Sequence, residues 1–209
     1  MFSNLLGAKP YAATSVAVAA FTGARLREIP ALRWSDLSFE NRTLRIARAI
    51  DETKKHRGIK QPKTERGHRT IEIGDGLVQL LAAERNKYLR LRAGIGDGTD
   101  VDLSLIRLPD DALMFPSGDG TNLTKLRDGR AVSRNVKARA RKLGFPKLRF
   151  HDLRGSHETI LLDKGVPVHV VAARGGQDPA TMLRVHAKRT KKADTAATNV
   201  IGTLTKGVL

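Results

Sequence analysis

The C-terminal third of the chain carries polar residues at characteristic spacings. The segment His151-Asp152-Leu153-Arg154 comes first, Gln177 lies 23 positions after Arg154, and His186 lies nine positions further on. Apolar periodicity predicts helices over 152–164, 168–174 and 180–191. A separation of three residues puts His151 and Arg154 on one helix face, from which both can reach the same ligand. The spacing therefore predicts a helical unit that gathers these side chains at one site.

The remaining sequence mixes helical and strand patterns. An apolar, Ala-rich run over 11–21 predicts a buried helix, and alternating residues over 43–49 and 69–73 predict strands of a small antiparallel sheet. Further expected elements are a short helix over 24–32, an amphipathic helix over 76–92, a Gly/Asp-rich loop over 93–111, an apolar stretch over 112–116 and a basic helix over 131–143. We therefore expect a single domain over 1–209, mainly α with a small antiparallel β-sheet (α+β).

The charge balance indicates a polyanionic partner. The chain has 38 Lys and Arg against 21 Asp and Glu, which gives a formal net charge of +17. The basic residues cluster over 54–69, 130–149 and 184–192. A charge of this size attracts phosphates strongly, so nucleic acid is the favoured partner, and a generally basic surface without a defined partner is the alternative. Candidate contacts to double-stranded DNA are Lys54, Lys55, Arg57, Lys60, Arg66, Arg134, Lys137, Arg141, Lys188 and Arg189.

Composition also excludes several classes of function. The sequence contains no Cys, which rules out disulfides and thiolate chemistry and fits a reducing cytoplasm. No apolar run approaches the ~20 residues of a membrane span, and the N-terminus lacks a secretion signal pattern. We therefore expect a cytoplasmic, nucleoid-associated protein with no membrane contact.

Two further motifs precede the segment over 151–154. The first is Phe21-Thr22-Gly23-Ala24-Arg25-Leu26-Arg27-Glu28, followed by the second part of the same block over 31–37. The second is Pro62-Lys63-Thr64-Glu65-Arg66-Gly67-His68-Arg69-Thr70-Ile71, and the segment over 151–154 closes the series. In this order and spacing they resemble the tyrosine recombinases (phage integrase family), over residues of about 10 to 192. The resemblance implies the catalytic domain of that family, mainly helical with a small sheet.

The resemblance also assigns roles. Arg25 and Arg154 would be the two catalytic arginines, Glu28 would orient Arg25, Lys63 would be the general acid, and His151 would assist beside Arg154. The chemistry fits, because two arginines can bind the charged non-bridging oxygens and a lysine can protonate the departing 5′ oxygen, with no metal or cofactor. Taken singly, Arg25 reads as a surface salt bridge to Glu28, Lys63 as part of a solvated charge run, and His151 as a helix-start or core histidine.

The sequence departs from the family at two candidate catalytic positions. The usual Leu-Gly-His is Gly175-Gly176-Gln177, and Gln177 can donate a hydrogen bond but cannot carry a proton. The nucleophilic Tyr is replaced by His186, whose shorter imidazole would fall short of the phosphorus. Three interpretations stay open: phosphohistidine transfer, a naturally decayed domain and an altered protein. A role of His186 as a metal ligand is disfavoured, because no other His or carboxylate lies at ligand spacing from it in the sequence.

The expected function is that of a DNA-binding catalytic domain of a site-specific recombinase, which integrates or excises a mobile element, with strand cleavage absent or impaired. The alternatives are a non-cleaving regulator that occupies recombination sites and a general basic RNA- or DNA-binding protein. The ordered motifs and the buried Ala-rich helix argue against the second alternative. The resemblance implies tetramers on DNA, with the tail over 195–209 as the exchanged segment, and an N-terminal core-binding domain that this sequence lacks.

Overall fold

The computed structural model describes residues 10–52, 57–62, 65–96, 99–118 and 121–186. Within these ranges the α-helices are α1 (Pro10–Thr22), α2 (Asp75–Ala93), α3 (Gly129–Lys142), α4 (Phe150–Asp163), α5 (Val168–Gly175) and α6 (Pro179–His186). The strands are β1 (Leu37–Ser38), β2 (Thr43–Ile46), β3 (Ala49–Glu52), β4 (Arg57–Lys60) and β5 (Arg69–Glu72), and the short 3-10 helices are η2 (Ile29–Ala31), η3 (Trp34–Asp36) and η4 (Glu65–Gly67). The expected fold class, mainly α with small antiparallel β-structure, is confirmed.

The strands form two small antiparallel sheets where one was predicted. Strand order is β1-β2-β5 in the first, with Leu44 opposite Ile71, and β3 pairs with β4 in the second. The chain leaves the first sheet after Ile46, and the N–H of Ile50 donates to the carbonyl of Arg27 at 2.8 Å. This contact holds β3 against the segment that follows α1, so the predicted strand over 43–49 is split. Strand β4 lies in the basic stretch over 54–69, for which no strand was predicted.

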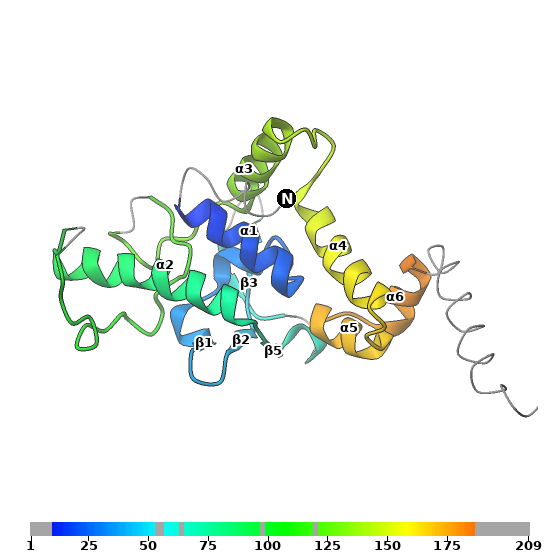
Figure 1. Cartoon of the computed structure of the whole chain (residues 1–209), viewed down its shortest axis with the longest axis horizontal. Helices are drawn as coiled ribbons and strands as arrows, with labels where there is room; N and C mark the ends of the chain where they lie inside the picture. Colours follow the sequence, from blue (N-terminus) through cyan, green and yellow to red (C-terminus); the bar gives the residue numbers. More distant parts are fainter. Residues whose placement is uncertain (1–9, 53–56, 63–64, 97–98, 119–120, 187–209) are drawn as a thin grey trace, which may run out of the picture.

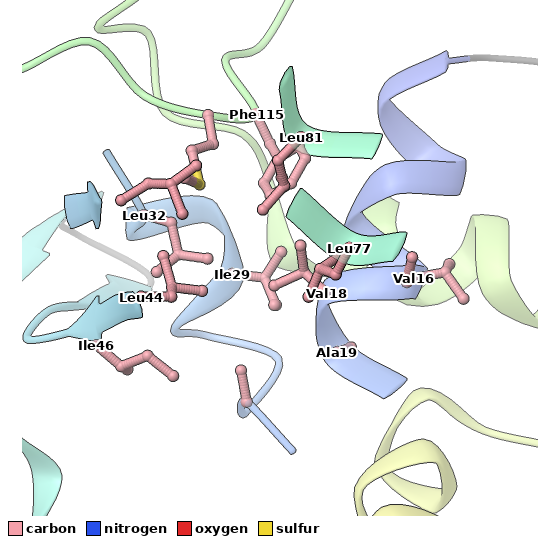
Figure 2. Packing of buried hydrophobic residues seen from close by; sticks show 14 of the residues in the cluster. Val16, Val18, Ala19, Ile29, Leu32, Leu44, Ile46, Leu77, Leu81 and Phe115 are labelled. Atoms are coloured by element: carbon pink, nitrogen blue, oxygen red, sulfur yellow. The ribbon is translucent and has the colours of Figure 1, made fainter. Parts of the chain in front are cut away.

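The main core forms around α1, as the Ala-rich run predicted. Residues 13–20 of this helix are all buried. Figure 2 shows Val16, Val18 and Ala19 of α1 in one cluster with side chains from the first sheet and from α2. Each fully buried aliphatic side chain of this kind stabilises the fold by about 1.5–3 kcal/mol. The core thus fixes the end of α1, from which the residues of the site continue.

The predicted helix over 24–32 is wrong, because only the 3-10 helix η2 forms there. Gly23 has a positive φ of 67° and ends α1, and the Glu28 carboxylate accepts the backbone N–H of Arg25 at 2.7 Å. Pro30 has no N–H to extend a helical ladder, and Leu32 is already extended.

The stretch over 112–116 is buried, and the N–H of Met114 donates to the carbonyl of Leu32.

The C-terminal helices pack together at one end of the molecule (Figure 1). Helix α4 contacts α1 and α5, α5 contacts α6, and α5 also contacts β5. Val171, Ala172 and Met182 form a second, smaller buried cluster between α5 and α6. Gly176, with φ of 63°, ends α5 in the left-handed conformation. The turn between α5 and α6 is thereby brought back to β5 and the end of α1.

The helices expected over 76–92, 131–143, 152–164 and 168–174 are confirmed as α2, α3, α4 and α5, and the stretch over 93–111 is a loop in its described part. The helix expected over 180–191 is α6, which is described as far as His186. The tail over 195–209 lies outside the described residues. No helix in the described ranges is long and apolar enough to cross a membrane.

Candidate functional site

A buried carboxylate joins two arginines at the start of the site. Glu28 Oε1 lies 2.9 Å from Arg25 Nη1, and Glu28 Oε2 lies 2.8 Å from Arg69 Nη2. Burial alone would raise the pKa of the Glu28 carboxyl, but the hydrogen bonds and charges of Arg69 and Arg25 outweigh it and hold the pKa below its ordinary value. Glu28 is therefore an anion that fixes both guanidinium groups.

The two predicted arginines meet at the turn after α5. Arg154 Nη1 donates to the carbonyls of Gly175 at 2.8 Å and Gly23 at 2.7 Å, and Arg25 Nη2 donates to the carbonyl of Gly176 at 2.6 Å. Only 5% of the Arg154 side chain is exposed, against 41% for Arg25. Arg154 Nη2 is buried and has no hydrogen-bond partner in the described part of the chain. Adjacent carbonyls of one turn thus orient both guanidinium groups.

Gln177 also belongs to this cluster, through an acid that sequence reasoning missed. Glu158 Oε1 lies 2.9 Å from Arg154 Nε and accepts a hydrogen bond from Gln177 Nε2 at 3.1 Å. Burial lowers the pKa of Arg154, and the charge of Glu158 opposes this effect. The sequence feature that could have revealed Glu158 was its position four residues after Arg154 on the same predicted helix, a spacing that pairs opposite charges.

Arg69 and Arg174 are further arginines that the sequence analysis did not assign to the site. Arg69 Nε donates to the carbonyl of Arg174 at 2.8 Å, which ties β5 to α5. Arg174 Nη2 in turn donates to the carbonyl of Glu72 at 2.9 Å. Arg69 shares the inward face of β5 with Ile71, because side chains alternate along a strand. The sequence feature that could have revealed Arg69 was its place on the inward face of a predicted strand, where a charged side chain needs a buried ionic partner.

The two histidines of α4 lie in different environments. His151 is exposed in the first turn, three residues before the buried Arg154, which agrees with a helix-start position. His157 is half-buried, and its Nδ1 lies 3.0 Å from the carbonyl oxygen of Ala20. Burial, and then the charge of Arg174, hold the pKa of His157 below its ordinary value. His157 was not predicted as a functional residue.

Two predicted catalytic residues cannot be placed with the others. Lys63 lies outside the described residues. His186 is the last residue of α6, and its side chain lies outside the described part. Tyr88, which is a phenol elsewhere in the chain, is 8% exposed and its ring centroid lies 6.1 Å from that of Trp34. Packing in the core therefore keeps Tyr88 from acting as a substitute nucleophile.

The predicted DNA contacts fall into three groups. Lys137 and Arg141 are exposed on α3, whose opposite face buries Val132 and Val136. Three others are paired with acids, namely Lys60 with Asp51 at 3.0 Å, Arg66 with Asp178 at 2.8 Å and Arg134 with Asp128 at 3.9 Å. Lys54, Lys55, Lys188, Arg189 and the side chain of Arg57 lie outside the described residues. Helix α3 is thus the described element with the clearest cationic face.

The described residues contain no group of three or more His, Asp or Glu side chains that could hold a metal ion. The chemistry of the cluster is that of guanidinium donors around a turn of two glycines. Such donors bind the oxygens of phosphate or carboxylate groups.

Solved structures of DNA recombinases share this fold. The Tn1549 transposon integrase, in complex with transposon right end DNA, aligns with a TM-score of 0.73 at 17% identity, over 96% of this chain and 62% of the other. The XerH site-specific recombinase, bound to a palindromic difH substrate, aligns with a TM-score of 0.61 at 18% identity, over 94% of this chain and 49% of the other. The integrase from mycobacterium phage Brujita aligns with a TM-score of 0.57 at 18% identity, over 91% and 52%. At these identities the likeness concerns the fold.

Sequence comparison agrees with the structural likeness. The chain is 29% identical over 162 residues to a XerC-like tyrosine recombinase of Caldanaerobacter subterraneus subsp. tengcongensis, in a match that covers 72% of this chain and 38% of that protein. The family model described as the phage integrase family matches residues 4–192. The chain belongs to the phage integrase family, and its fold is that of the catalytic domain of tyrosine recombinases.

Proposed function

We propose that this chain is the DNA-binding catalytic domain of a site-specific recombinase that integrates or excises a mobile element, with strand cleavage impaired by His186. The observation that carries the proposal is the meeting of Arg25 and Arg154 at the carbonyls of Gly175 and Gly176. Two oriented guanidinium groups can bind the two non-bridging oxygens of a phosphodiester and stabilise the charge that develops there.

Each residue of the proposed site has a separate task. Arg25 is the more exposed of the two arginines and makes the first contact with the phosphate, whereas Arg154 contributes its unpaired Nη2 from the buried side. Gln177 keeps one of its two amide N–H groups for a phosphate oxygen, because Glu158 accepts the other. Lys63 protonates the departing 5′ oxygen and His151 assists beside Arg154, as the family resemblance implies.

Double-stranded DNA is the proposed partner. The recombinase structures with this fold include complexes with DNA, and the +17 charge attracts a polyanion. The exposed residues Lys137 and Arg141 of α3 would contact the backbone phosphates. Replacing both by Gln should weaken duplex binding and reduce the slope of log affinity against log salt by about two. The exposed residues Arg92 and Arg107 serve as a charge-matched control, and replacing both by Gln should change the slope of log affinity against log salt by less than about one half.

Several copies of the chain would assemble on DNA, as a tetramer, with the tail over 195–209 exchanged between copies. A groove between the end of α1 and helices α4 and α5 supports this proposal, because Phe21, Ile160 and Val170 line it and are each about half exposed. An apolar groove of this kind gains free energy when an apolar chain segment covers it.

The decisive test concerns position 186. His186→Tyr should restore covalent trapping of nicked (suicide) duplexes drawn from a randomised pool, and Gln177→His added to it should raise the rate roughly ten- to a thousandfold. His169→Tyr, on the exposed surface of α5, introduces the same side chain away from the site and should trap nothing.

Two outcomes would contradict the proposal. Cleavage by the unaltered chain that His186→Ala abolishes would make His186 a working nucleophile. A His186→Tyr variant that binds duplexes, blocks an active recombinase at its site and forms no adduct would favour the second candidate, a non-cleaving regulator that occupies recombination sites. The engagement of Gln177 by Glu158 is the observation that favours this candidate.

A further inference from the structure

A second carboxylate lies inside the proposed phosphate site. Glu158 and Arg154 are both almost fully buried, with 7% and 5% of their side chains exposed. One oxygen of Glu158 serves both Arg154 Nε and Gln177 Nε2. This acid therefore contacts two of the residues that would hold the phosphate.

A glycine at position 175 leaves open the space that this acid and its arginine occupy. A Cβ atom added at Gly175 would lie 3.1 Å from Glu158 Oε1 and 2.8 Å from Arg154 Nη2. The carboxylate and the guanidinium thus occupy the space that a side chain at position 175 would take. Glu158 therefore depends on the missing side chain at Gly175 for space and on Gln177 for a hydrogen bond.

The carboxylate changes both the charge and the donors that the site offers. Arg25, Arg69 and Arg154 face the two acids Glu28 and Glu158, so the cluster carries +1 where it would carry +2 without Glu158. Arg154 Nε and one N–H of Gln177 point to the acid and are withdrawn from any ligand. An anion nearby also repels a phosphodiester at short range.

We propose that Glu158 is a positioning residue that holds Arg154 and Gln177 in place and lowers the affinity of the site for phosphate. This inference rests on the proposed phosphate site. It makes the position four residues after Arg154 a determinant of how tightly the site holds its substrate, independent of the residue at 186.

The test compares the binding of inorganic phosphate by the full chain and its variants, measured by calorimetry. Glu158→Gln keeps the shape of the side chain and removes its charge, and we expect about tenfold tighter binding, the effect of one unit charge a few ångströms away in a partly solvated site. Asp163→Asn changes the net charge equally at an exposed position of the same helix and should alter the affinity less than about twofold.

Thermal midpoints measured in parallel separate the two roles of Glu158. A purely structural role would lower stability and phosphate affinity together, whereas the proposal predicts a gain in affinity even if stability falls. Should Glu158→Gln not fold, Glu158→Ala removes the same charge together with the bulk of the side chain, and we again expect about tenfold tighter binding. A folded variant of either kind that binds phosphate no more tightly than the original chain would overturn the proposal.

Arg25→Met distinguishes failure of this inference from failure of the proposed function. If Arg25→Met weakens phosphate binding and Glu158→Gln leaves it unchanged, the phosphate site stands and the role of Glu158 is refuted. If Arg25→Met has no effect on phosphate binding, the proposed site itself is wrong.

Discussion

Gly175→Ala probes whether the Arg154 guanidinium is held where the structure places it. A Cβ at this position would lie 2.8 Å from Arg154 Nη2 and 3.1 Å from Glu158 Oε1, closer than normal contacts allow. Arg154 cannot move away freely, because its Nη1 is bound to the carbonyls of Gly23 and Gly175. The added methyl group therefore forces a hydrogen bond or the buried ion pair to give way.

The expected cost follows from two opposing effects. Overpacking a buried site by one methyl group costs about 1–3 kcal/mol, and alanine gains up to about 1 kcal/mol over glycine in a helix. The net loss for Gly175→Ala is about 1–2 kcal/mol, which for a chain of this length lowers the thermal midpoint by roughly 2–8 °C. Phosphate binding should weaken as well, since the proposed site uses the N–H groups of Arg154 Nη2 and the added methyl group displaces that guanidinium.

Gly155→Ala is the matched control, because this glycine lies in α4 next to Arg154 and a Cβ there would have no atom within 4 Å. It should raise the midpoint by about 2–4 °C through helix propensity alone. Thermal denaturation followed by circular dichroism measures both variants. A Gly175→Ala variant as stable as Gly155→Ala would show that Arg154 does not occupy this position and would refute the geometry on which the site depends.

Two further predictions concern buried charge and pH. Arg69→Met leaves the buried Glu28 carboxylate with one partner fewer and should lower the free energy of unfolding by about 3 kcal/mol, measured in urea at pH 7. Because Glu28 is then protonated more easily, this loss of stability should shrink as pH falls toward 4.5. Arg42→Met breaks only an exposed pair and should cost less than about 1 kcal/mol; equal losses would contradict the role given to Arg69. Since the pKa of His157 is lowered in the fold, stability should be complete above its unfolded value near 6.5 and decline as pH falls through the folded pKa, and His157→Asn should flatten that decline in thermal midpoints measured between pH 8 and 5.

Local patterns predicted most of the fold because they depend on neighbours in sequence. The Ala-rich run over 11–21 and the amphipathic run over 76–92 each have a periodicity that fits one element, and both helices form. The segment over 24–32 failed because its conformation depends on the Glu28 carboxylate and on Pro30 rather than on helical propensity. The single predicted sheet became two because a tertiary hydrogen bond, from Ile50 to Arg27, draws the chain aside.

The site could be predicted only in part for a similar reason. Motif order identified Arg25, Arg154 and Gln177, which the structure brings to one turn. Their partners Arg69 and Glu158 have no conspicuous motif, and their importance comes from burial next to residues far away in sequence. A sequence pattern shows charge but not exposure, so paired and unpaired cations look alike until the packing is known.

The buried charges themselves bear on whether the site binds an anion. Four charged side chains around one turn, those of Glu28, Arg69, Arg154 and Glu158, are almost fully buried. Removing them from water is expensive, and apolar packing at such places is often at least as stable. Stability alone therefore does not account for Arg25, Arg69 and Arg154 with their two acids. The proposed phosphate site offers a reason for them, because donors that are already fixed need no reorganisation when charge develops on a bound phosphate. Helix α6 packs on α5 through Met182. In the proposed site the phosphate contacts come from residues other than His186, which is why a single restored phenol, in His186→Tyr, is expected to restore cleavage.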